Sequence, residues 1–106
     1  MKLITKTLEN KLRKFPPHSQ EGKGDNAEII VKFFGGYAYT FLATEAEFLE
    51  DDIYFFGKAT LDGSFWGWGS VSLKELQSIC FPPFGLPIER DRYLESGITV
   101  AEYLKR

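Results

Sequence analysis

AEIIVKFFGGYAYTFLATEAEFLEDDIYFFGKATLDGSFWGWGSV, the stretch from residue 27 to residue 71, decides the fold. Four of its segments have the β-branched and aromatic composition of strands, namely 27–34, 37–46, 53–61 and 64–71. Gly35-Gly36 and Asp62-Gly63 are typical of hairpin turns because glycine tolerates positive φ, and Glu50-Asp51-Asp52 forms an acidic turn. Strands joined by such short turns need no crossover helix, so the stretch predicts an antiparallel meander.

Alternation along the first strand indicates which side chains share a face. Ile29, Val31 and Phe33 alternate with Glu28 and Lys32, which predicts that the three apolar residues point into the core together. A sheet with one strongly apolar face is covered on that face, so we expect the helices on a single side of the meander.

Short helices are predicted before and after the meander. Residues 5–14 carry apolar side chains at helical spacing, and Pro16-Pro17 ends this segment because proline cannot continue a helix. Capping boxes at Ser72–Glu75 and Thr99–Glu102 each open a further helix, the first ending near Phe81. The predicted fold class is therefore α+β, with an antiparallel sheet of about four strands packed by two or three short helices.

Composition limits the class of protein. The chain has 106 residues, which fit a single domain over residues 1–106. Its 13 basic and 15 acidic residues give a net charge of −2. A chain with this charge is not expected to have the broad basic surface of most nucleic-acid binders. The sequence contains no apolar run of 18 residues and its start does not resemble a signal peptide, so we expect a cytoplasmic protein without a membrane segment.

The single cysteine and the single histidine provide no catalytic group that we can argue from the sequence. Cys80 alone excludes an internal disulfide and a cysteine-built zinc site, and its apolar neighbours predict a buried small hydrophobe. His18 follows a proline and is expected on an exposed loop, and the glycines of this loop lack the spacing of a phosphate-binding loop. We predict no catalytic residue, no metal ligand and no cofactor.

Trp66 and Trp68 are the first candidate binding residues. They stand two positions apart on a strand, so both rings are predicted to project from one face. Such a pair could form an aromatic platform for a base, a sugar or a peptide. The alternative is that the two rings cover the core beneath a helix.

Glu89, Arg90 and Asp91 form a second candidate cluster, to which Glu21 of the 18–26 loop is added. On a strand the two carboxylates of the cluster would share one face, where they could bind a divalent metal or provide a base. The alternative is that the alternating charges form ion pairs that dock the C-terminal segment.

The chain resembles the DUF2958 family from residue 2 to about residue 95. The most specific parts of the resemblance are a Ser-Leu-x-Glu-Leu helix start at Ser72–Leu76 and an Ile-Glu-Arg-Asp segment within Gly85–Asp91. The other matching segments are Lys2–Thr5, Ser19–Gly22, Lys32–Phe34, Thr44-Glu45 and Phe56-Gly57. It implies a small bacterial protein of the kind carried by plasmids and conjugative elements, and it implies no established activity.

Three functions are compatible with these features. The first is a non-enzymatic accessory or interaction module of a mobile genetic element, which contacts a protein partner through residues 18–26 and 89–92. The second is a small metal-dependent hydrolase or nuclease, which requires the 18–26 loop to bring Glu21 beside Glu89 and Asp91. The third is a single-stranded nucleic-acid binder, in which the two tryptophans stack on bases and basic residues bind phosphates, namely Lys6, Arg13 and Lys14.

Overall fold

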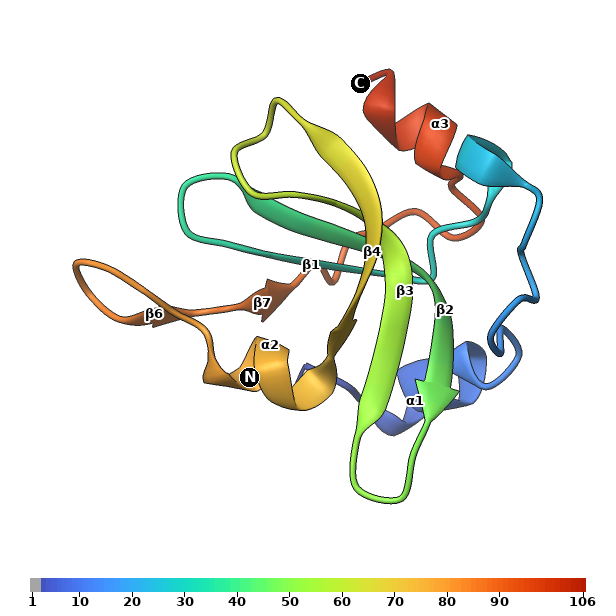
Figure 1. Ribbon diagram of the computed structural model, residues 1–106, viewed down its shortest axis with the longest axis horizontal. Helices are drawn as coiled ribbons and strands as arrows, with labels where there is room; N and C mark the ends of the chain where they lie inside the picture. Colours follow the sequence, from blue (N-terminus) through green and yellow to red (C-terminus); the bar gives the residue numbers. More distant parts are fainter. Residues whose placement is uncertain (1–2) are drawn as a thin grey trace.

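The computed structural model describes residues 3–106 and contains a five-stranded antiparallel sheet of order β4-β3-β2-β1-β7 (Figure 1). The strands of this sheet are β1 (Val31–Gly35), β2 (Tyr39–Phe48), β3 (Ile53–Thr60), β4 (Trp66–Ser72) and β7 (Glu89–Arg90). Strands β1 to β4 follow one another as a meander, which confirms the predicted α+β class. The fifth strand, β7, pairs with the free edge of β1.

Three short α-helices and a 3₁₀ turn accompany the sheet, namely α1 (Lys6–Leu12), η1 (Gly24–Asn26), α2 (Leu73–Ser78) and α3 (Val100–Leu104). Both predicted capping boxes are present: Ser72 and Glu75 exchange hydrogen bonds at the start of α2, and Thr99 and Glu102 do so at the start of α3. None of these helices, in the part of the chain that the structure describes, has the length and apolarity needed to span a bilayer.

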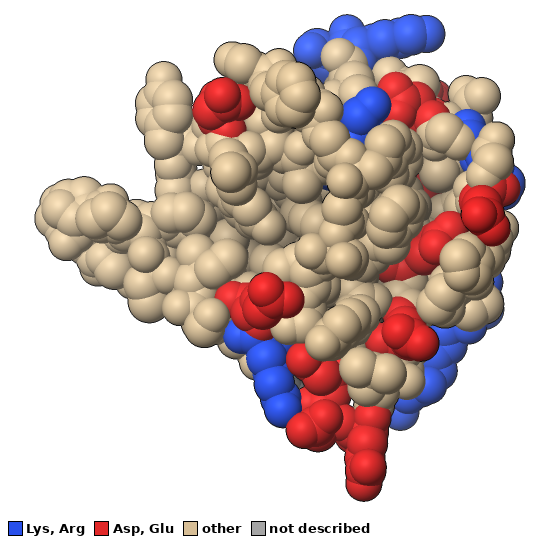
Figure 2. Space-filling model, viewed as in Figure 1, with Lys and Arg blue, Asp and Glu red and all other residues tan. Residues whose placement is uncertain are grey.

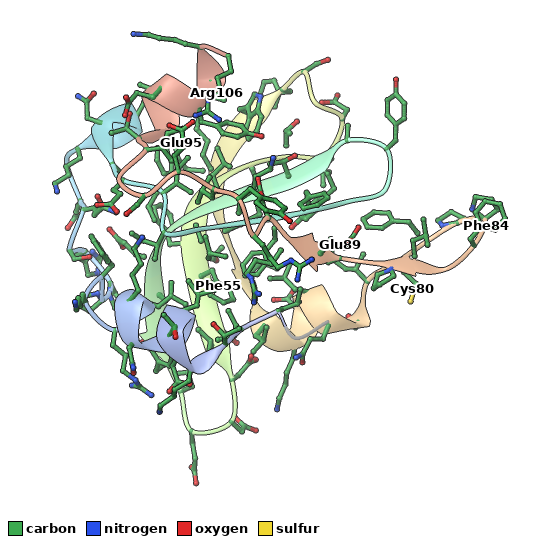
Figure 3. The ribbon with its side chains drawn as sticks, turned by 180° about the vertical axis from the view of Figure 1, so that it is seen from behind. Phe55, Cys80, Phe84, Glu89, Glu95 and Arg106 are labelled. Carbon is green, nitrogen blue, oxygen red and sulfur yellow. The ribbon has the colours of Figure 1, made fainter. Side chains whose placement is uncertain are left out.

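Helix α2 is shorter than predicted. It ends at Ser78, and the chain continues into a small hairpin of β5 (Cys80–Phe81) and β6 (Leu86–Pro87). This hairpin projects from the body of the molecule, with Phe84 near its tip (Figure 3). Cys80 is exposed on it, so the prediction of a buried cysteine is wrong.

The sheet has apolar clusters on both faces, which corrects the expectation of helices on a single side. The larger cluster lies on the face covered by α1 and α2 and includes Phe33 and Phe55, whose rings meet edge to face at 5.0 Å. The smaller cluster lies on the opposite face and is covered by α3; it includes Ile29 and Leu42. Ile29 therefore does not share a face with Val31, because the regular strand begins only at Val31.

A β-bulge at Thr44 changes the alternation of β2. Ala43 lies opposite Gly57 of β3, but the next paired residue is Glu45, opposite Phe56, and Thr44 has no partner of its own. A regular strand would turn Glu45 to the same face as Ala43; the bulge turns it to the other face. The bulge thus places a carboxylate on the face that carries α3.

Candidate functional site

The 18–26 loop is fastened to the sheet by two buried polar side chains. Both carboxylate oxygens of Glu45 accept backbone N–H groups, from His18 at 2.9 Å and from Gln20 at 3.0 Å. The Gln20 amide nitrogen donates to the carbonyls of Glu28 and Thr44, each at 2.8 Å, and its oxygen accepts the Glu28 N–H at 2.7 Å. Glu45 is 6% and Gln20 4% exposed, so these bonds replace water that burial removes.

The loop has a second contact with the sheet, and its backbone turns sharply at two residues with positive φ. Asp25 of η1 accepts from the Lys58 ammonium at 2.8 Å, which ties the loop to β3. His18 has φ +70°, a left-handed conformation that non-glycine residues rarely adopt, and Gly22 follows at φ +86°. The Glu45 bond to the His18 N–H holds this conformation in place.

Two aromatic rings form the wall opposite the loop. Phe56 of β3 and Trp68 of β4 stack with centroids 5.6 Å apart and planes 11° apart, and each residue is 41% exposed. The Lys58 ammonium lies 5.5 Å from the centroid of the Trp68 ring, within the range of a cation–π contact. The wall is therefore apolar but already has a positive charge beside it.

A cavity of about 320 Å³ lies between the loop and this wall, and we call it the loop cavity. Its lining residues are His18, Gln20, Glu21, Gly22, Gly24, Ala27, Thr44, Glu45, Phe56 and Trp68. Thr44 and Glu45 are buried at its base, whereas the His18 and Glu21 side chains are mostly exposed and pair across 3.1 Å. The cavity thus combines aromatic surface with two carboxylates.

Charged side chains lie along this side of the molecule. Figure 2 shows carboxylates on the right-hand side of the view, where the 18–26 loop runs, with basic groups along the same edge, and carboxylates over the turn between β2 and β3 at the bottom. Because Lys58 pairs with Asp25, the Glu21 and Glu45 carboxylates are the charges that face the cavity itself. Its electrostatic character is negative.

The two candidate tryptophans have different environments. Trp68 lines the loop cavity, and so does the candidate residue Glu21. Trp66 packs on the smaller cluster, where its ring meets Tyr103 of α3 edge to face at 6.2 Å. One tryptophan therefore contributes to the open site, and the other, as in the alternative interpretation, covers the core beneath a helix.

The Glu89–Asp91 cluster lies at the other edge of the sheet, on and beside β7, where Figure 3 labels Glu89. Arg90 donates to the carbonyl of Leu3 at 2.8 Å, and Asp91 lies 3.7 Å from the Lys32 ammonium. These contacts dock the C-terminal segment. Arg90 and Asp91 line a separate cavity of about 330 Å³ beside α1.

The three carboxylates that the alternative metal-dependent function requires are not brought together. Glu21 lines the loop cavity, whereas Asp91 lines the cavity beside α1, so the loop does not fold over the Glu89–Asp91 segment. Within residues 3–106, no three acidic, histidine or cysteine side chains are grouped so that they could hold a metal ion.

The residues predicted to bind a nucleic acid lie on opposite faces of the sheet. Helix α1, which precedes Arg13, covers the larger cluster and lies in front of the sheet in the view from behind (Figure 3). Arg13 itself pairs with Glu9 at 2.9 Å and stacks over Phe48 at 4.0 Å. Trp66 packs on the smaller cluster and Trp68 lines the loop cavity, so in residues 3–106 helix α1 and the two rings lie on different faces of the sheet.

Glu45 and Phe56 were not among the sequence candidates, and Gln20 was included only as part of the 18–26 loop. Glu45 belongs to an acidic run in the sequence, yet it stands in the buried part of β2, where the other residues from Phe41 to Ala46 are apolar apart from Thr44. That interruption of an apolar segment is the signal that could have found it, because buried carboxylates need hydrogen-bond partners.

Fold and site define a small α+β domain in which an anchored loop and two stacked rings enclose an acidic cavity. The chain belongs to the family described as "Protein of unknown function (DUF2958)", whose model matches residues 3–106. No curated protein and no solved structure matches the chain.

Proposed function

We propose that this protein is a non-enzymatic accessory module of a bacterial mobile genetic element and that it binds a protein partner through the loop cavity. The observation that carries the binding role is the anchoring of the loop: five hydrogen bonds of Glu45 and Gln20 fix one wall of the cavity before any ligand arrives. A preformed site loses little conformational entropy on binding. The mobile-element role rests on the resemblance to plasmid-borne proteins.

The surface around the cavity has the composition of a protein-binding site. Aromatic residues dominate the energetic centres of protein interfaces, and half-exposed Phe56 and Trp68 offer such a centre beside polar groups of the loop. An exposed thiol at Cys80 suits a reducing compartment, which supports the expected cytoplasmic location.

A capture experiment tests the binding role. The tagged protein is incubated with lysate of a bacterium that carries the element, and bound proteins are compared for the wild type, Trp68→Ala and Tyr37→Ala. Tyr37 is fully exposed in the β1–β2 turn and outside the cavity, so its variant is the matched aromatic control. We expect Trp68→Ala to lower capture of a specific partner at least about tenfold.

Thermal unfolding of each variant establishes that the compared proteins are folded. If Trp68→Ala is folded and captures the same partner as strongly as the wild type, the loop cavity is not the binding site and the proposal is wrong.

A further inference from the structure

We infer that the loop cavity accepts an arginine side chain of the partner protein. This inference rests on the proposed function, since it specifies what part of the partner enters the site. Three properties carry it: the charge of the lining, the geometry of the aromatic wall and the unused acceptor capacity of the carboxylates.

The charge of the lining favours a cation. Glu21 and Glu45 contribute two carboxylates, and none of the residues that line the cavity in the described chain is a lysine or an arginine. The Lys58 ammonium beside the aromatic wall is paired with Asp25 at 2.8 Å. A positively charged side chain would therefore gain attraction from both glutamates, whereas an acidic or neutral one would not.

The aromatic wall favours a flat cation. The rings of Phe56 and Trp68 are nearly parallel, 11° apart, and both line the cavity. A guanidinium group is planar and weakly hydrated, so it stacks on aromatic faces more readily than the compact ammonium of lysine.

The carboxylates retain acceptor capacity for such a group. Each oxygen of Glu45 accepts one backbone N–H, and a carboxylate oxygen can accept two hydrogen bonds. The Glu21 side chain is 72% exposed, and its ion pair is with the exposed His18 ring. An arginine that enters along the aromatic wall can therefore donate to Glu21 in the two-pronged geometry of guanidinium–carboxylate pairs.

A pair of capped peptides tests the inference on the whole protein. The probe is acetyl-Gly-Arg-Gly-amide, and its control carries citrulline, the neutral shape-analogue of arginine, in the same position. Titrations are followed by backbone amide NMR shifts of residues 18–24 and by the indole N–H shift of Trp68. We expect saturable millimolar binding of the arginine peptide that weakens with added salt, and at least about tenfold weaker binding of the citrulline peptide.

Charge variants locate the contact. Glu21→Gln is expected to weaken the arginine peptide about two- to fivefold, the range of an exposed ion pair. Glu50→Gln removes the same charge from the exposed β2–β3 turn, outside the cavity, and is expected to leave the affinity unchanged. Equal affinity for the citrulline peptide, or an equal effect of the two variants, would overturn the inference.

The two experiments fail independently. If neither peptide binds while Trp68→Ala still weakens capture of a partner, the cavity is a binding site for another group and only the arginine inference falls. If Trp68→Ala leaves capture intact, the proposed function itself falls.

Discussion

The backbone N–H of Gln20 donates to Oε2 of Glu45 at 3.0 Å, and this bond joins a polar loop to the middle of an apolar sheet. The side chain of the same Gln20 continues the connection, because it bonds the carbonyl of Thr44, the residue that precedes Glu45. Loop and strand thus hold each other through one buried carboxylate and one buried amide. The position of the loop wall depends on these two residues.

Glu45→Ala is expected to release the loop. The change leaves the N–H groups of His18 and Gln20 without their acceptor, which costs about 1–3 kcal/mol of the free energy of unfolding. Urea denaturation measures this loss, and hydrogen exchange of the two amides should become faster than that of the sheet. Glu47→Ala, two positions along the strand and exposed, should lower stability by less than about 0.5 kcal/mol.

Gln20→Glu is expected to be more damaging despite its nearly identical shape. At neutral pH a carboxylate oxygen replaces the donor that faces the carbonyls of Glu28 and Thr44, so a buried charge meets two acceptors. We expect a loss of about 3 kcal/mol or more in the free energy of unfolding. Gln77→Glu, the same exchange on the exposed face of α2, is the control; similar losses in both variants would contradict the role assigned to Gln20.

Gly57 and Gly69 lie opposite each other on β3 and β4, yet they should respond differently to alanine. A Cβ at Gly57 would lie 1.9 Å from the carbonyl oxygen of Leu42, so Gly57→Ala should cost about 3 kcal/mol or more or prevent folding. A Cβ at Gly69 meets nothing within 4 Å, and Gly69→Ala should leave stability unchanged or raise it by up to about 1 kcal/mol. Thermal unfolding distinguishes the two.

The turn between β3 and β4 is expected to weaken in acid. Hydrogen bonds from the N–H groups of Phe65 and Ser64 hold the pKa of Asp62 below its ordinary value of 3.8. A depressed pKa contributes stability above the ordinary value, and this contribution is lost as the pH falls through the lower, folded-state pKa.

Asp62→Asn should therefore be less stable than the wild type at neutral pH, and the difference should shrink as the pH falls below 3.8. Denaturation curves recorded across this range measure the difference. A gap between the two proteins that stays constant down to the lowest pH would show that the charge of Asp62 does not stabilise the turn.

The parts of the fold that depend on neighbouring residues were predictable from the sequence. The capping boxes of Ser72 and Thr99 form because each needs only a residue three positions further along. The Asp62-Gly63 turn forms because Gly63 adopts φ +84°. These local signals were sufficient to define the meander.

The site was only half predictable, because it depends on pairing between distant segments. Trp68 and Glu21 were candidates on composition, but Glu45 was not, since regular alternation gives no sign of the bulge that turns it toward the loop. The separation of Glu21 from Asp91 likewise follows from which edge of the sheet each segment reaches. Spacing along the chain does not contain that information.

Thr44 is the extra residue of the bulge: between Ala43 and Glu45, β2 has one residue more than the paired segment of β3. The Thr44 carbonyl accepts a hydrogen bond from the Gln20 side-chain amide, so this carbonyl binds the loop instead of the neighbouring strand. A chain shortened by this residue could keep Glu45 opposite Phe56 and still build a continuous ladder, but it would lose that acceptor. The number of residues in β2 at this point therefore matters for the loop, independently of which side chains they carry. Insertions or deletions here should be tolerated less well than substitutions.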